Sequence, residues 1–135
     1  MKNVRYFLLV ALVLISVLPG LAKDKKLTVL YTNDLHAHFE PHIVPWVSKT
    51  RKVGGFVNIA TLVKREKKAN KHTVYFDAGD SFSGPYHSFL TKGEAVIDAM
   101  NYLGLDASAV GNHEFDHGWD NALEQFYEKN IGSLP

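Results

Sequence analysis

Three short polar motifs contain the residue types that could support metal chemistry. The motifs are Asp34-Leu-His36, Gly79-Asp80 and Asn112-His113. Each alone is weak evidence, because Asp and Asn are common in the turns that follow strands and short motifs arise by chance. Together they carry more weight, because each one follows a segment with the composition of a strand.

The side chains of these motifs suit divalent cations. Carboxylate and carbonyl oxygens favour hard ions, and imidazole suits zinc, iron and similar ions. Asp34 and His36 would share one ion, Asp80 would bridge two, and the side-chain carbonyl of Asn112 would bind the second. Two such ions clamp the entering and leaving oxygens of a phosphoryl displacement and lower the pKa of a bound water. The pattern therefore predicts a two-metal hydrolase that needs no protein nucleophile.

His113 and Asp116 form a second candidate element beside these ligands. A carboxylate that bonds to an imidazole fixes its tautomer and supports its charged form. A histidinium at this place would stabilise developing charge and protonate the leaving alkoxide. The alternative is that both are loop residues, with Glu114 or Asp116 capping the next helix.

Alternating strand and helix patterns position these motifs. Apolar and β-branched runs predict strands at residues 27–32, 73–77 and 107–110. Helical periodicity predicts helices from Phe56 to a basic cluster ending at Lys71, from a capping box at Thr91–Glu94 to Gly104, and from Trp119 to near Asn130. Residues 33–54 are expected to form a long irregular loop.

This β-α-β-α-β-α order predicts an α/β fold with parallel strands joined by helical crossovers. In such sheets, ligand sites form outside the carboxyl ends of the strands. We therefore expect one rim to hold the candidate residues Asp34, His36, Asp80, Asn112 and His113.

Longer stretches around these motifs resemble the calcineurin-like metallophosphoesterases, specifically their secreted 5′-nucleotidase branch. The matching stretches are Tyr31–His38, Asp77–Asp80, Thr91–Gly104 and Gly111–Asp116. The resemblance implies the N-terminal part of a catalytic domain in which two mixed sheets are flanked by helices. It also implies hydrolysis of nucleotide phosphomonoesters, and possible further substrates in the branch are UDP-sugars and 2′,3′-cyclic nucleotides.

The resemblance also implies residue roles and two divalent ions such as zinc, manganese or magnesium. The matching positions are Asp34 and His36 for the first metal, Asp80 for the bridge, Asn112 for the second metal, and His113 with Asp116 for the catalytic pair.

Family members have three further histidine ligands in later segments, including a Gly-His-x-His motif, and a C-terminal domain that binds the nucleoside. The sequence ends at Pro135 without them, and no such motif contains His38, His42, His72, His87 or His117. Two interpretations therefore stay open. The chain is the truncated N-terminal part of a 5′-nucleotidase-type enzyme, or it is a catalytically inactive remnant with at most weak metal binding. A third, an anion-binding module at the basic helix end, rests only on clustered charge.

The N-terminus predicts export. Lys2 and Arg5 precede 13 residues, Tyr6–Leu18, that are apolar apart from Ser16, and small residues precede a cleavage site after Ala22. Because a membrane span needs roughly 20 apolar residues, residues 1–22 are interpreted as a signal peptide rather than a permanent anchor. The catalytic part would then occupy residues 23–135 in the periplasm or outside the cell.

Composition excludes some functions for this mature part. Loss of the two N-terminal positive charges takes the net charge from +1 to −1. This near-neutral balance offers no electrostatic basis for binding polymeric nucleic acid. The sequence contains no cysteine, so disulfides and thiolate metal sites are excluded.

Overall fold

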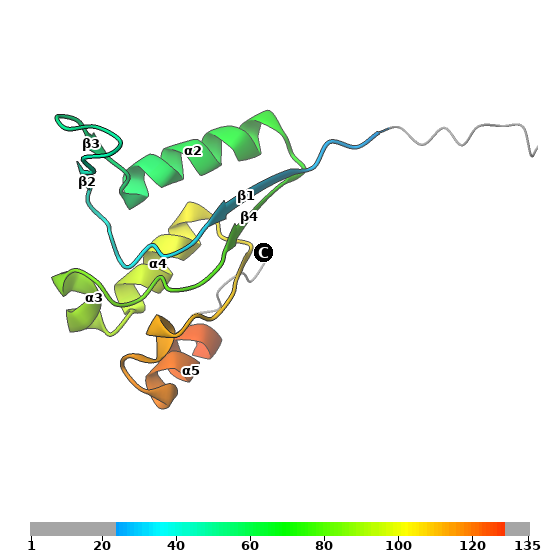
Figure 1. Cartoon of the computed structure of the whole chain (residues 1–135). Helices are drawn as coiled ribbons and strands as arrows, with labels where there is room; N and C mark the ends of the chain where they lie inside the picture. The colour runs from blue at the N-terminus through cyan, green and yellow to red at the C-terminus, as the bar shows by residue number, and fades with distance from the viewer. Residues whose placement is uncertain (1–23, 129–135) are drawn as a thin grey trace, which may run out of the picture.

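The computed structural model describes residues 24–128, so the predicted signal peptide at residues 1–22 lies outside the described residues. The described part is an α/β structure whose central sheet has three parallel strands (Figure 1). These are β1 (Thr28–Thr32), β4 (Thr73–Asp77) and β5 (Ala107–Ser108), in the order β1-β4-β5. The prediction of an α/β fold with parallel strands is confirmed.

The register of the sheet aligns the ends of its strands. Thr32 of β1 pairs with Asp77 of β4, and Asp77 pairs with Ser108 of β5. These are the last residues of the three strands. The loops that follow therefore all start from the same edge of the sheet.

The three predicted helices are present. They are α2 (Phe56–Ala69), α4 (Glu94–Leu103) and α5 (Trp119–Glu128). The capping-box prediction located the start of α4 correctly but assigned the wrong cap. Gly93 is the N-cap, in the left-handed conformation, while Thr91 is the last residue of a short helix α3 (Tyr86–Thr91).

The long loop after β1 is more ordered than expected. It contains an antiparallel pair, β2 (His42–Ile43) and β3 (Lys52–Val53). A 3-10 turn, η1 (His113–Phe115), lies between β5 and α5. Residues 24–128 thus contain one parallel sheet and one antiparallel pair, and the two mixed sheets stay a prediction.

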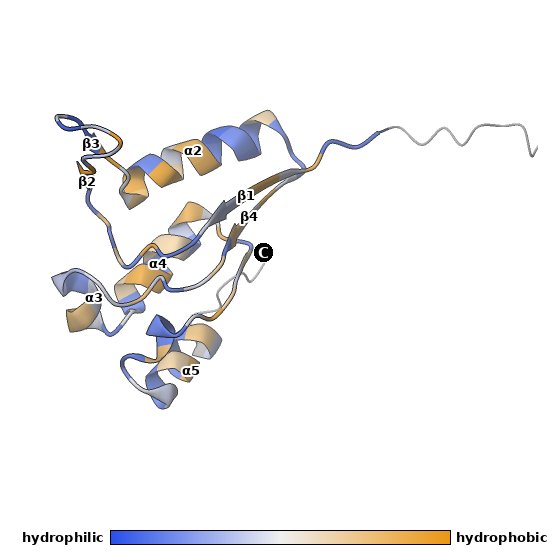
Figure 2. Cartoon of the chain, in the orientation of Figure 1, coloured by the Kyte–Doolittle hydropathy of each residue, from blue (hydrophilic) through white to orange (hydrophobic). Residues whose placement is uncertain are grey.

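The core lies on one face of the sheet. Tyr75 of β4 is buried there with apolar side chains of α2 and α4, which also contact each other. The main buried contributors from the helices are Phe56, Ala60, Val63, Val96, Ile97, Met100 and Leu103. Figure 2 shows α4 as mostly hydrophobic, and α2 as more hydrophobic in its first half than in its second. Among the described helices, none combines the length and apolar character that crossing a membrane requires.

Candidate active site

The loops after β1, β4 and β5 bring together a histidine, an aspartate and a second histidine. One potential ligand atom from each of His36, Asp80 and His113 lies within 4.8 Å of the others. The rings of His36 and His113 meet edge to face with centroids 4.8 Å apart. These residues come from three separate segments, so the strand-end argument located them correctly.

The other two candidate ligands lie at the margin of this cluster. An oxygen of Asp34 lies 3.8 Å from Nε2 of His36, and its other oxygen accepts a 2.5 Å hydrogen bond from the Asn33 side chain. Asn112 is exposed and directly precedes η1, next to His113 in the chain. Both are therefore near the cluster, while His36, Asp80 and His113 form its centre.

The hydrogen bond of His36 assigns its tautomer. Nδ1 of His36 lies 3.0 Å from the carbonyl oxygen of Ser83. A carbonyl oxygen can only accept, so in the neutral ring Nδ1 carries the proton and Nε2 keeps a free lone pair. A backbone carbonyl commonly orients a metal-ligating histidine in this way. His36 therefore has the tautomer that a metal ligand needs.

His113, Asp116 and Ser83 form a second network. Nδ1 of His113 donates to Oδ2 of Asp116 over 2.7 Å, and the Ser83 hydroxyl donates to the same oxygen. The hydrogen bond to Asp116 raises the pKa of His113. The bonds from His113 and then Ser83 lower the pKa of Asp116. The expected His–Asp pair is thus present as a hydrogen-bonded pair of exposed side chains.

The backbone around the cluster adopts uncommon conformations. Positive φ angles of 44° to 56° occur at Asp34, His36, Ala37, Asp80 and Ser83. Residues other than glycine rarely adopt them, and such strain concentrates at functional sites. Backbone hydrogen bonds between the loop after β1 and the loop after β4 hold this strained backbone in place. The amides of Asp34 and His36 donate to the carbonyls of Gly79 and Asp80.

Two glycines allow the loops to approach closely. A Cβ atom at Gly84 would lie 1.9 Å from the carbonyl oxygen of His36, and one at Gly111 would lie 2.2 Å from Oδ1 of Asp80. Any side chain at either position would displace a residue of the cluster.

Two buried carboxylates that the sequence motifs did not indicate as site residues lie beneath the site. Glu114 is 1% exposed, and its carboxylate accepts four backbone N–H groups from two loops. The sequence pattern indicates Glu114 only as a cap of the next helix. Asp77 is also buried and accepts hydrogen bonds from Thr32, Gly79 and Ser81. Two features of the sequence could have indicated them. Asp77 stands at the end of a predicted strand, and Glu114 directly follows the candidate catalytic residue His113.

The remaining histidines lie outside the cluster. The rings of His38 and His42 lie tilted to each other with centroids 4.8 Å apart, and with His87 they line a hollow of about 300 Å³. Burial, followed by the charge of His42, lowers the pKa of His38. His117 lines another hollow, of about 410 Å³, which borders Ser83 and Asp116.

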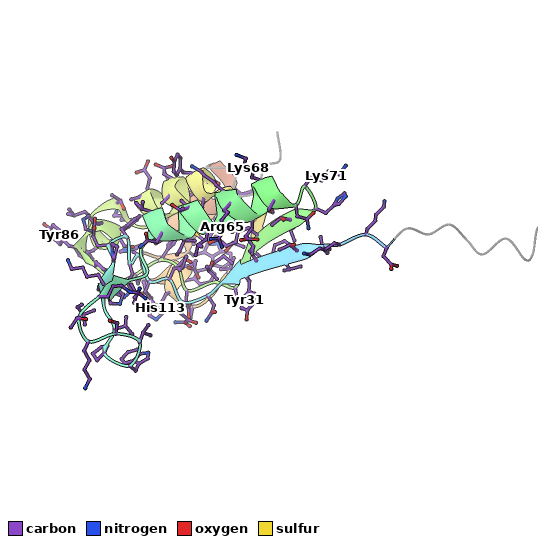
Figure 3. All side chains as sticks on the ribbon, turned by 90° about the horizontal axis from the view of Figure 1, so that it is seen from above. Tyr31, Arg65, Lys68, Lys71, Tyr86 and His113 are labelled. Atoms are coloured by element: carbon purple, nitrogen blue, oxygen red, sulfur yellow. The ribbon has the colours of Figure 1, made fainter. Side chains whose placement is uncertain are left out.

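The basic cluster at the end of α2 is separate from this site. Lys67 donates to the carbonyl of Gly104, Lys64 lies 3.8 Å from the ring centroid of Tyr102, and Arg65 pairs with Glu66. Figure 3 labels Lys68 and Lys71 far from His113.

Comparison with known proteins agrees with the fold and the motifs. The Calcineurin-like phosphoesterase family matches residues 27–134. The 5′-nucleotidase of Bos taurus is 39% identical over 106 residues, which cover 76% of this chain and 18% of that protein. A probable 5′-nucleotidase of Treponema pallidum is 33% identical and covers 78% of this chain and 18% of its own length.

A solved structure of a 5′-nucleotidase precursor is also similar to this chain. The 5′-nucleotidase precursor of Thermus thermophilus is 33% identical with a TM-score of 0.72, over 78% of this chain and 21% of that chain. The chain thus spans about a fifth of the length of these relatives. Its motifs, its fold and these matches agree: the chain belongs to the calcineurin-like phosphoesterase family, and its relatives include 5′-nucleotidases.

Proposed function

We propose that this chain contributes part of the active site of a metal-dependent hydrolase of nucleotide phosphomonoesters. The observation that carries the proposal is the meeting of His36, Asp80 and His113 at the edge where three parallel strands end. The similarity to 5′-nucleotidases supports the substrate class.

The donor set fits divalent ions such as zinc, manganese or magnesium. In the neutral His36 ring, Nε2 offers a lone pair, and Asp80 offers a carboxylate at the same point. Asp34 would complete the first metal site, and Asn112 would serve a second ion bridged by Asp80. When bound, such ions supply positive charge to phosphate oxygens and lower the pKa of a water.

His113 is proposed to act as the general acid. Its Nδ1 proton is committed to Asp116, so Nε2 is the atom that exchanges a proton with the substrate. Its raised pKa favours the imidazolium form, which stabilises negative charge on the phosphate and can protonate the leaving oxygen. Asp116, held by Ser83, orients the ring.

The remaining assignments extend this proposal. UDP-sugars and 2′,3′-cyclic nucleotides are further candidate substrates. Residues 23–135 would belong to the catalytic domain, a C-terminal domain would bind the nucleoside, and the signal peptide at residues 1–22 would direct export to the periplasm or beyond.

A second candidate function is metal binding without turnover. Within residues 24–128, His36, Asp80 and His113 form the sole cluster of three His, Asp or Glu side chains with converging ligand atoms. On this basis the purified chain would bind Mn²⁺ or Zn²⁺ yet release no phosphate from AMP. Phosphate release that disappears in the His113→Ala variant would contradict this second candidate and support the first.

A chimaera tests the proposed function directly. Residues 27–128 would replace the matching segment of the Thermus thermophilus 5′-nucleotidase. We expect metal-dependent phosphate release from AMP, and His113→Ala should lower kcat by about 10²–10⁴-fold. The control His72→Ala changes an exposed histidine that precedes β4 and should leave kcat unchanged. Equal rates for the His113→Ala and parent chimaeras would refute the assigned role.

A further inference from the structure

Glu114 is a buried carboxylate in an exposed neighbourhood. It is 1% exposed, whereas the side chains of His113 and Asp116 beside it are 38% and 41% exposed. We propose that Glu114 is a positioning residue that sets the geometry of Asp80 and His113 by joining the loops after β4 and β5. The inference rests on the proposed function, because it assigns a role in the same site.

The hydrogen bonds of Glu114 divide between its two oxygens. Oε2 accepts from the backbone amides of Asp80, over 3.0 Å, and Gly111, over 2.7 Å. Oε1 accepts from the amides of Ser81, over 2.7 Å, and Phe82, over 3.1 Å. Three donors come from the loop after β4 and one comes from the loop after β5. A buried charge is tolerated only with such partners, so the burial of Glu114 requires both loops to keep this arrangement.

The effect of Glu114 on Asp80 is direct. Asp80 has a φ of 56°, which is unfavourable for a residue with a side chain. Its amide is held by Glu114 and its carbonyl accepts from the amide of His36, so bonds on both sides maintain the strained backbone.

A further hydrogen bond orients the side chain of Asp80. The amide of His113 donates to its Oδ1 over 3.0 Å, and Gly111 packs against that oxygen. Since Glu114 anchors Gly111 and Asp80 through one oxygen, it fixes the distance between the segment that carries His113 and the carboxylate of Asp80.

Two substitutions separate the charge of Glu114 from its geometry. In Glu114→Gln, an NH₂ group replaces one of the acceptor oxygens and faces two N–H donors. In Glu114→Asp the charge stays, but the side chain is one methylene shorter and cannot reach all four amides from the same backbone position. A positioning role predicts weaker Mn²⁺ binding in both variants. A role of the charge alone predicts that Glu114→Asp binds Mn²⁺ like the wild type.

The experiment measures Mn²⁺ affinity of the full chain by electron paramagnetic resonance and amide environments by NMR. Glu114→Gln and Glu114→Asp should each weaken Mn²⁺ binding by about tenfold or more, the effect typical of residues that orient ligands. The amide resonances of Asp80 and Gly111 should shift, while circular dichroism stays that of the wild type. The control Glu124→Gln, which removes an exposed charge on α5, should change neither measurement.

Wild-type affinity in both folded Glu114 variants would overturn the inference, as would normal affinity in Glu114→Asp alone. If the wild-type chain binds no Mn²⁺, the proposed function fails, and unshifted Asp80 and Gly111 amides in Glu114→Gln would then overturn the inference separately. If neither variant folds, hydrogen exchange of the wild type decides. Slow exchange at Asp80, Ser81, Phe82 and Gly111 supports the inference, and exchange as fast as that of an unbonded surface amide contradicts it.

Discussion

The pairing of His113 with Asp116 depends on one 2.7 Å hydrogen bond between exposed side chains. That bond is the largest cause of the raised pKa of His113 and of the lowered pKa of Asp116. The charged state of the proposed general acid is therefore controlled by a neighbour three residues along the chain.

Replacing this neighbour should lower the pKa of His113. In Asp116→Asn the acceptor loses its charge, so the imidazolium loses the interaction that favours it. His113 would then deprotonate at a lower pH than in the wild type, and its share of protonated form near neutral pH would fall. A pH titration of the His113 ring resonances measures this, with the exposed Asp120→Asn as control. An unchanged pKa in Asp116→Asn would show that the hydrogen bond does not govern the charge.

Among the individual residues of the site, the sequence predicted those at the surface better than those beneath it. His36, Asp80 and His113 follow strands, so strand alternation was sufficient to bring them together. The position of Glu114 after His113 marks it as a candidate, but its role depends on amides about 30 residues away in the chain, which the local sequence does not indicate.

The helices and strands are tied together by a polar link as well as by the core. Lys67 of α2 donates to Oδ2 of Asp106 over 2.9 Å and to the carbonyl of Gly104, the C-cap of α4. Oδ2 of Asp106 also accepts the amide of Tyr75 in β4 over 2.7 Å. Asp106 thus joins α2 to β4, the strand before the loop that contains Asp80, and Lys67 extends this link to the end of α4.

Removing this link should destabilise the fold. Asp106→Ala leaves the amide of the buried Tyr75 without its acceptor and the ammonium of Lys67 with only the Gly104 carbonyl. This loss should lower the free energy of unfolding by about 1–3 kcal/mol. Urea denaturation of the full chain checks this. Asp98→Ala, at an exposed position of α4, should have a much smaller effect. Equal stability of the two variants would contradict a structural role for Asp106.

Periodicity predicted the longer elements but not the short ones. The apolar stripes of α2 and α4 pack in the core as expected. The sequence did not predict the two-residue strands β2 and β3 or the six-residue helix α3, because elements of this length are too short for an apolar pattern to repeat over two periods. Gly93 caps α4 through a left-handed backbone conformation that the pattern at Thr91–Glu94 did not indicate.

The described molecule covers its sheet on one face only. Helices α2 and α4 pack on the face that contains Tyr75. On the other face, the exposed fractions are 50% for Val29, 75% for Tyr31 and 40% for Phe76, and Figure 3 shows Tyr31 at the margin away from α2. The site therefore lies at the edge of a sheet with one uncovered apolar face in residues 24–128, and the sequence alone did not indicate which face this would be.

The proposed function depends on the loops after β1, β4 and β5 forming a metal site. The most direct test is a Mn²⁺ titration of the full chain, followed by electron paramagnetic resonance, for the wild type, Asp80→Asn and the control Asp98→Asn. We predict saturable binding to the wild type and the control, and at least about tenfold weaker binding to Asp80→Asn, because Asp80 supplies the carboxylate between His36 and His113. Equal Mn²⁺ affinity of Asp80→Asn and the wild type would contradict a metal site formed by these three loops.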